Sequence, residues 1–128
     1  MKENTKIYLL LLIIFILCVI GELSAQSIKS VKTHLNASQI QYKEIVLQQI
    51  ILETGRLSSY SCKHRHNLFG FRYKGEYLIF DSWQDSIAYY QRWQKRHYKG
   101  GDYYQFLTDR GYATDKNYIN KLKQITVK

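Results

Sequence analysis

Apolar residues recur at helical spacing between Ser38 and Gly55, which predicts the first strong helix of the chain. Ser38 is followed three residues later by Gln41, which is a capping-box pattern, and Gly55 suits a left-handed helix end. Glu53 lies three residues after Ile50, so its side chain shares the apolar face of this helix. The helix is therefore expected to carry a carboxylate into an apolar setting in its last turn.

Three further helices are expected in the second half of the chain. Ser82, Asp102 and Asp115 each precede a run with apolar residues at helical spacing, and serine and aspartate are favoured N-caps. Residues 26–37 are expected to form a linker or a short helix, and residues 56–67 a polar loop.

A short β-hairpin is expected between the first two strong helices. Residues 68–73 and 77–80 have the composition of extended segments, and Lys74-Gly75-Glu76 between them suits a turn. Together with the helices, this hairpin predicts an α+β domain that is mostly α.

The N-terminus has the pattern of a signal peptide. Lys2 and Lys6 precede an apolar run over residues 7–20, and small and polar residues then lead to a plausible cleavage site after Ala25. The run is shorter than the roughly 20 residues of a membrane-spanning helix. Residues 1–25 are therefore expected to be removed on export, and the alternative is an uncleaved anchor.

The charge of the chain favours an anionic partner. Its 128 residues include 19 Lys and Arg but only 10 Asp and Glu, for a net charge of +9. Loss of residues 1–25 would remove two lysines and two glutamates and leave that net charge unchanged. An exported basic domain suits bacterial cell wall, a membrane surface or nucleic acid. Cys62 would be the one remaining cysteine, which excludes an intrachain disulfide.

Glu53 is the leading candidate for a proton donor. Burial and the negative end of a helix both oppose ionisation of its carboxylate, so its proton would be held closer to neutral pH. Most other carboxylates have expected capping or solvent-facing positions, which leaves Glu76 and Asp81 as competitors. The alternative for Glu53 is a structural carboxylate paired with Arg56 or another cation.

Other groups of residues give weaker evidence for a functional site. Cys62, His64 and His66 have spacing that could suggest zinc, but a structural zinc site needs four ligands and no second cluster follows, so no metal is expected. Cys62 as a thiol nucleophile would lack an orienting partner. Residues 92–99 mix bases with aromatics as nucleic-acid binders do, but in an exported protein a solvated helix face is favoured, and no nucleic-acid partner is expected.

Three short segments carry a resemblance. They are Ile51-Leu52-Glu53-Thr54-Gly55, Asn67-Leu68-Phe69-Gly70 and Gly111-Tyr112-Ala113-Thr114-Asp115. With these segments in this order the chain resembles the bacterial glucosaminidase domain family, glycoside hydrolase family 73, which includes flagellar peptidoglycan hydrolases and autolysins. One departure is Thr54, where a serine is commoner in the family.

The resemblance implies a lysozyme-like fold over residues 38–128, with an α-lobe and a short β-hairpin lobe flanking a substrate cleft. It implies an endo-β-N-acetylglucosaminidase, and no cofactor is expected. With the N-terminal signal pattern, the chain is expected to be an exported monomer of the periplasm, cell envelope or cell exterior. Its partner would be the glycan strands of peptidoglycan, cleaved at the β-1,4 bond after N-acetylglucosamine. Glu53 matches the family's general acid, Tyr112 its cleft tyrosine, and Asn67 and Phe69 the motif that shapes the hairpin base.

The second catalytic group is open. Many relatives carry a longer hairpin lobe with a second acid, whereas Glu76 is the sole acid between Gly70 and Asp81. Glu76 is a candidate for that role, or is solvated at a turn, in which case the acetamido group of the substrate could attack the anomeric carbon. Three aromatic residues are further candidates for the walls of the cleft: Tyr77, Trp83 and Tyr60.

Three alternatives to the glucosaminidase assignment stay open. The first is a muramidase or lytic transglycosylase that uses the same Glu53. The second is a cell-wall-binding module without catalysis. The third is a cationic membrane-active protein.

Overall fold

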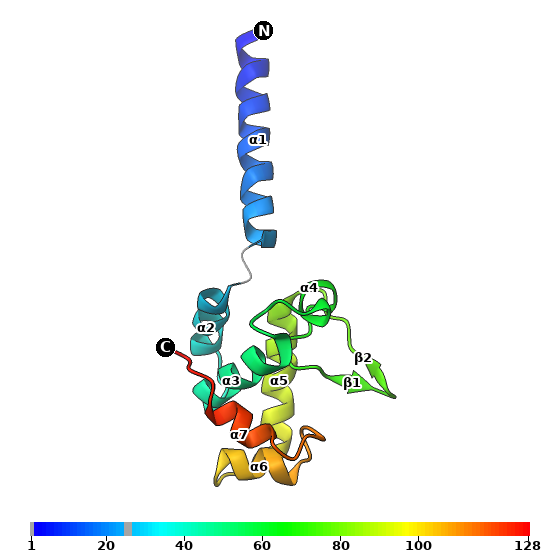
Figure 1. Ribbon diagram of the computed structural model, residues 1–128. Coiled ribbons are helices and arrows are strands. Elements are labelled where there is room, and N and C mark those ends of the chain that lie inside the picture. The colour runs from blue at the N-terminus through cyan, green and yellow to red at the C-terminus, as the bar shows by residue number, and fades with distance from the viewer. Residues whose placement is uncertain (1, 25–26) are drawn as a thin grey trace.

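The computed structural model describes residues 2–24 and 27–128, which form seven helices and one two-strand hairpin (Figure 1). The helices are α1 (Lys2–Ser24), α2 (Ile28–Ala37), α3 (Lys43–Thr54), α4 (Tyr60–Arg65), α5 (Trp83–His97), α6 (Tyr103–Asp109) and α7 (Tyr118–Lys123), and the antiparallel strands are β1 (Arg72–Tyr73) and β2 (Glu76–Tyr77). This composition confirms the prediction of a mostly helical chain with a short hairpin.

Helix α1 extends away from the other elements (Figure 1). The side chains from Ile7 to Ile16 on this helix are exposed although they are apolar. Within residues 2–24 and 27–128, no helix combines the length and apolar character needed to cross a membrane. The cleavage site predicted after Ala25 lies outside the described residues.

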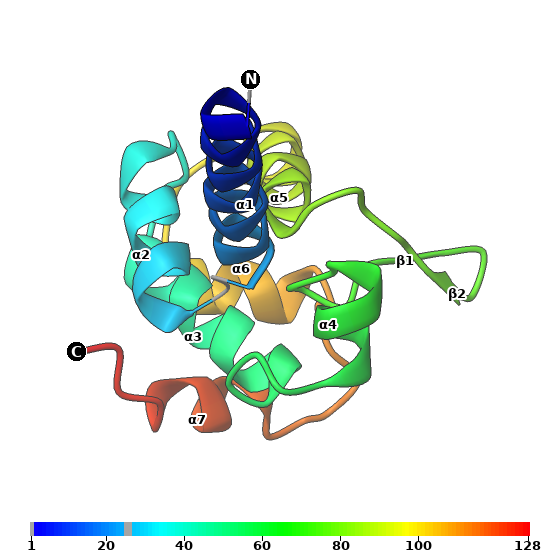
Figure 2. The ribbon, with the colours of Figure 1, turned by 90° about the horizontal axis from the view of Figure 1, so that it is seen from above.

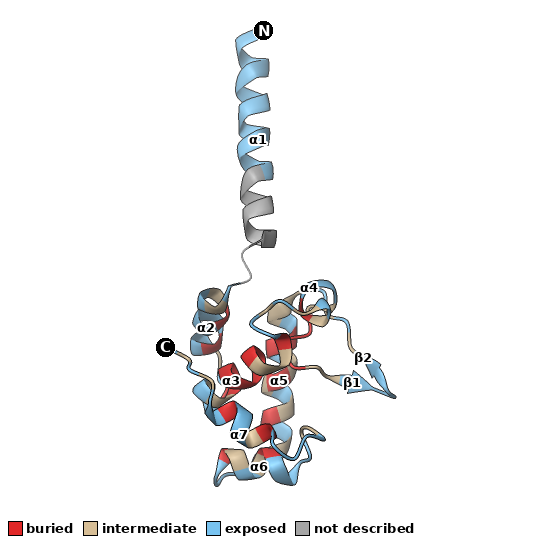
Figure 3. Cartoon of the chain, viewed as in Figure 1, coloured by how far each residue is buried: buried red, intermediate tan, exposed pale blue. Residues whose placement is uncertain are grey.

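Helix α3 is the centre of the core. Helices α2 and α7 pack against it, and Figure 2 shows it surrounded by the other helices. Val46 and Ile50 of α3 are fully buried, as is Val31 of α2. Of the two alternatives expected before Ser38, a linker or a short helix, residues 28–37 therefore form a helix that packs into the core. Figure 3 shows that buried positions concentrate on α3 and the helices around it, whereas the hairpin is exposed.

The predicted start of α3 at Ser38 is wrong. Ser38 instead ends α2: its hydroxyl donates to the Leu35 carbonyl at 2.6 Å. The backbone N–H of Gln41 donates to the Gln94 side chain on α5 at 2.8 Å, so tertiary contacts hold this segment out of the helix. Helix α3 begins at Lys43, and it ends as predicted at Gly55, which has a φ of 54°.

Two of the three predicted caps in the second half are confirmed. The side chains of Ser82 and Asp102 accept hydrogen bonds from backbone N–H groups in the first turns of α5 and α6. Asp115 does not cap α7, whose N-cap is Asn117. The Asp115 carboxylate instead accepts from the Asn117 N–H at 2.8 Å and pairs with Lys121.

The segment between α3 and α5 differs from the prediction in two ways. Residues 56–67 contain helix α4, capped by the Ser59 side chain, where only a loop was expected. The strands of the hairpin have two residues each, and Glu76 is paired with Tyr73 in β2 rather than placed in the turn. Residues 68–71 are not in a strand. The N–H groups of Phe69 and Phe71 donate to the Asn67 side chain, and the Phe71 carbonyl accepts from the Leu78 N–H beside the hairpin.

Candidate active site

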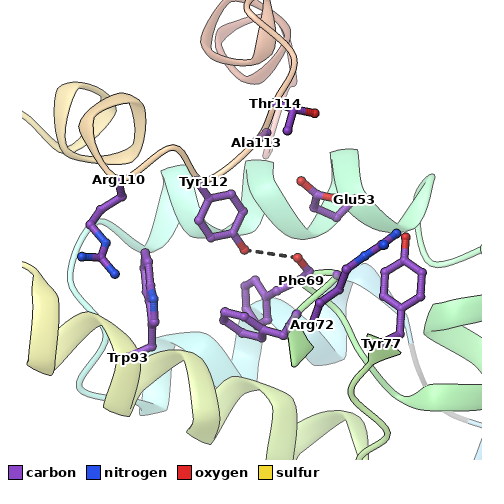
Figure 4. Close-up of a pocket in the computed structure, with 11 residues that line it drawn as sticks. Glu53, Phe69, Arg72, Tyr77, Trp93, Arg110, Tyr112, Ala113 and Thr114 are labelled. Atoms are coloured by element: carbon purple, nitrogen blue, oxygen red, sulfur yellow. Dashed lines mark hydrogen bonds between the residues drawn. The ribbon is translucent and has the colours of Figure 1, made fainter. Parts of the chain in front are cut away.

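An open pocket of about 620 Å³ lies where the end of α3 faces the hairpin and the segment after α6 (Figure 4). Five parts of the chain contribute to it: α3, the loop after Asn67, the hairpin, α5 and the segment between α6 and α7. The lining residues are Glu53, Phe69, Gly70, Phe71, Arg72, Tyr77, Trp93, Arg110, Tyr112, Ala113 and Thr114.

Glu53 brings a partly buried carboxylate to this pocket from the last turn of α3. Burial raises the pKa of Glu53 above its ordinary value, and a hydrogen bond from Tyr118 offsets part of that increase. No cation pairs with Glu53 among the described residues, where the one ion pair joins Lys121 to Asp115. The carboxyl group is therefore suited to keep a proton at a higher pH than an ordinary glutamate does.

Buried hydrogen bonds hold the Tyr118 side chain that interacts with Glu53. The Tyr118 hydroxyl accepts from Gln49 at 3.3 Å, and the other end of the Gln49 amide accepts from the Tyr90 hydroxyl at 2.6 Å. Gln49 and Tyr90 are fully buried. Because satisfied buried networks are rigid, the position of the Glu53 carboxyl is defined by three elements, α3, α5 and α7.

Asn67 organises the loop that forms the floor of the pocket. Its amide donates to the carbonyls of Phe71 and Leu78 at 2.9 and 3.0 Å, and its oxygen accepts from the N–H groups of Phe71 and Phe69 at 3.1 and 3.4 Å. These bonds join the loop to Leu78, directly after the second strand of the hairpin. The side chain is 1% exposed, so Asn67 acts beneath the pocket and does not line it.

Gly70 lets this loop approach Glu53. Its φ of +68° is in the region that favours glycine, and a Cβ at this position would lie 3.4 Å from Oε2 of Glu53. The Gly70 backbone therefore forms part of the wall next to the carboxyl group.

Tyr112 faces the loop from the other side of the pocket. Its hydroxyl donates to the Phe69 carbonyl at 3.2 Å, which Figure 4 shows as a dashed line. Its ring contacts Trp93 and Tyr118, with centroids 5.6 and 5.8 Å away. Burial raises the pKa of Tyr112 well above its ordinary value, so the hydroxyl remains a hydrogen-bond donor.

The structure brings together four of the eight site residues predicted from sequence, since Glu53, Phe69, Tyr77 and Tyr112 all line the pocket. The other four lie outside its lining: Asn67, Glu76, Trp83 and Tyr60. Glu76 is exposed on β2. The Trp83 ring packs against the ring of His34 on α2, with centroids 5.3 Å apart. The Tyr60 ring packs against that of His64 on α4, with centroids 4.3 Å apart. Trp83 and Tyr60 thus contact other surfaces than this pocket.

Sequence reasoning missed several lining residues. Arg72 closely follows the Asn-Leu-Phe-Gly segment, and Arg110 directly precedes Gly111-Tyr112. Their closeness in sequence to these segments could have identified both arginines as lining residues. Trp93 was expected only as an apolar residue of its helix, and it lines the pocket between Phe106 and Tyr112.

The Cys62, His64 and His66 segment divides between core and surface. Cys62 is fully buried, whereas His64 is exposed. Across residues 2–24 and 27–128, no three His, Cys, Asp or Glu side chains are grouped so that they could hold a metal ion.

The raised pKa of Glu53 predicts a pH-dependent cost to stability. The pKa of Glu53 is higher in the folded than in the unfolded state. Its contribution to the free energy of unfolding is therefore fully present below the unfolded pKa and is lost as pH rises through the folded pKa. Glu53→Gln stays neutral and should therefore raise the Tm at pH 8 but not at pH 4. Glu44→Gln, on the exposed face of the same helix, should give no such gain. Equal Tm values for wild type and Glu53→Gln at both pH values would contradict the prediction.

A comparison with protein families finds one match over most of the chain. The family model for Glucosaminidase, described as mannosyl-glycoprotein endo-beta-N-acetylglucosaminidase, matches residues 28–128. The match begins at the first residue of α2 and includes every lining residue of the pocket. No curated protein and no solved structure matches the chain.

Proposed function

Because the chain belongs to the glucosaminidase family of glycoside hydrolases, we propose that it cleaves the β-1,4 bond after N-acetylglucosamine in peptidoglycan, with Glu53 as general acid. The observation that carries this proposal is the setting of Glu53. It is the one carboxylate among the described residues that line the pocket, and burial raises its pKa. Protonation of the leaving oxygen needs a carboxyl group that keeps its proton until substrate is bound.

Tyr112 has a supporting role in this proposal. Its ring stands in the pocket wall between Trp93 and Tyr118, where an aromatic face can pack against a sugar ring. Its hydrogen bond to Phe69 fixes it relative to the loop beside Glu53. Tyr112 would thus position the sugar whose bond is broken and help to stabilise the charge that develops there.

For the second chemical role we favour the acetamido group of the substrate over Glu76. Glu76 is exposed on β2 and lies outside the lining of the pocket that holds Glu53. Attack by the acetamido oxygen on the anomeric carbon needs one enzyme carboxyl group, which donates a proton to the leaving oxygen and then accepts one from water. The bond would be cleaved with retention of configuration, because two displacements occur at the same carbon.

Peptidoglycan is proposed as the substrate because of charge and architecture. The net charge of +9 suits an anionic wall polymer better than a neutral glycan. The pocket is bordered by helical elements on one side and by the hairpin residues Arg72 and Tyr77 on the other. This supports the proposal of a lysozyme-like cleft that a polymer enters from the side. The N-terminal segment supports export to the periplasm, envelope or exterior, where this polymer occurs.

The products of cleavage test the proposed bond. Purified peptidoglycan treated with the protein should yield fragments whose new reducing end is N-acetylglucosamine, as read by mass spectrometry after borohydride reduction. Fragments that end in reducing N-acetylmuramic acid would indicate a muramidase, and anhydro ends a lytic transglycosylase. Binding to sacculi without any fragment release would favour a non-catalytic wall-binding module.

A further inference from the structure

Two arginine side chains border the pocket from separate elements. Arg72 begins β1, and Arg110 is the C-cap of α6. Figure 4 shows Arg110 on the side of Trp93 and Arg72 on the side of Tyr77, with the centre of the pocket between them. Apart from Glu53, they are the charged residues among the described lining of the pocket.

Neither guanidinium group has an acidic partner among the residues that the structure describes. Both side chains are exposed, and the one ion pair in the described part of the chain joins Lys121 to Asp115. The Arg72 guanidinium lies 3.9 Å from the centroid of the Tyr77 ring, in a cation–π stack. Such a stack occupies the face of the group and holds it in place, while its N–H donors point outward in the plane.

The charge balance of the pocket favours an anionic ligand. When Glu53 carries the proton that its proposed role requires, the lining contains two positive groups and no negative one. A neutral glycan offers these groups only hydroxyl and amide oxygens. A carboxylate can accept two parallel hydrogen bonds from one guanidinium, which are stronger than bonds between neutral groups.

We propose that Arg72 and Arg110 bind carboxylates carried by the glycan, on the two sides of the bond next to Glu53, and so select acidic strands over neutral ones. This inference rests on the proposed function. In a strand where N-acetylglucosamine alternates with a sugar that bears a lactyl or peptide carboxyl group, a cut after N-acetylglucosamine leaves an acid-bearing sugar directly on one side. The next acid-bearing sugar lies one residue further on the other side. Arg72 and Arg110, on opposite sides of the pocket, provide one cation for each of these two acids.

The test compares one glycan in two charge states. Soluble, uncrosslinked peptidoglycan strands are used either unmodified or with their carboxyl groups converted to amides, and kcat/KM is measured from the fragments released. Amidation should lower kcat/KM of the wild type about tenfold or more, because charge-assisted hydrogen bonds are lost. Arg72→Gln and Arg110→Gln should each lose about tenfold on acidic strands, and the double variant should cleave both substrates at similar rates. Arg56→Gln, an exposed arginine outside the pocket, removes the same charge and should stay within about twofold of wild type.

The outcomes separate this inference from the proposed function. Wild type that cleaves amidated strands as fast as acidic ones overturns the inference and leaves the glucosaminidase activity in place. Equal losses by the arginine variants on both substrates also overturn it, because they would indicate a role in positioning or folding. Wild type that cleaves neither substrate overturns the proposed function and the inference with it. Should the double variant fail to fold, the two single variants decide the result on the same pair of substrates.

Discussion

Glu53→Gln is expected to lower the rate of peptidoglycan cleavage by about 10²–10⁴-fold, the range typical for loss of a general acid. Glutamine has nearly the same shape but no carboxyl proton to donate to the leaving oxygen. The pocket contains no other described carboxylate among its lining residues that could replace it. Binding of the variant to purified sacculi should remain, since the substitution removes no positive charge and keeps the shape of the side chain. Clearing of a sacculus suspension and pelleting with sacculi measure the two properties separately.

Two further carboxylate variants make this result specific. Glu44→Gln has the same chemical change on the exposed start of α3 and should keep wild-type activity within about twofold, as for other surface substitutions. Glu76→Gln distinguishes the two routes for the second step. Retained activity supports the acetamido route, and a loss as large as that of Glu53→Gln would assign the second carboxylate to Glu76. Undiminished clearing of sacculi by Glu53→Gln would refute the proton-donor role. Lysis of intact cells by Glu53→Gln without fragment release from sacculi would favour a membrane-active protein.

Asn67→Ala is expected to lower the free energy of unfolding by about 3 kcal/mol, because it leaves several buried backbone groups without partners. Its side chain makes four hydrogen bonds to the backbone of residues 69, 71 and 78, and it is 1% exposed. Urea unfolding followed by circular dichroism gives the change in free energy.

Two companion variants separate this network from helix or surface effects. Asn36→Ala removes the same amide from an exposed position of α2 and should change the free energy of unfolding by less than about 0.5 kcal/mol. Asn67→Asp keeps an oxygen that can accept from Phe71 but loses the donor to Phe71 and Leu78, so it should be as damaging as alanine or more so. A stability of Asn67→Ala equal to that of Asn36→Ala would show that the loop does not depend on these bonds.

The helix ends that could be predicted from the sequence are those set by residues a few positions away. The Ser82 and Asp102 caps each bond to an N–H three residues on, and Gly55 ends α3 in a left-handed conformation, so short-range patterns were sufficient. The start of α3 depends instead on Gln41, which bonds to Gln94 more than fifty residues away. No local pattern contains that information, and the helix was therefore predicted to begin too early.

The same distinction applies to the pocket. Glu53, Phe69 and Tyr112 belong to recognisable segments, so their presence in one site could be expected before the fold was known. Trp83 and Tyr60 were chosen for aromatic character alone, and the packing of α2 and α4 places them elsewhere. No sequence pattern identifies Arg72 and Arg110 as site residues, because their place in the pocket depends on which side chains lie across it in the fold.

The placement of the aromatic side chains also has a spectroscopic consequence. The chain contains two tryptophans, and only Trp93 lines the pocket, whereas Trp83 packs against His34 at the surface of α2. Trp83→Phe would leave a single indole fluorophore at the edge of the site. Its emission would then respond to a sugar that displaces water from that ring, so glycan binding could be titrated without a label, even in a protein that carries Glu53→Gln and cannot turn over.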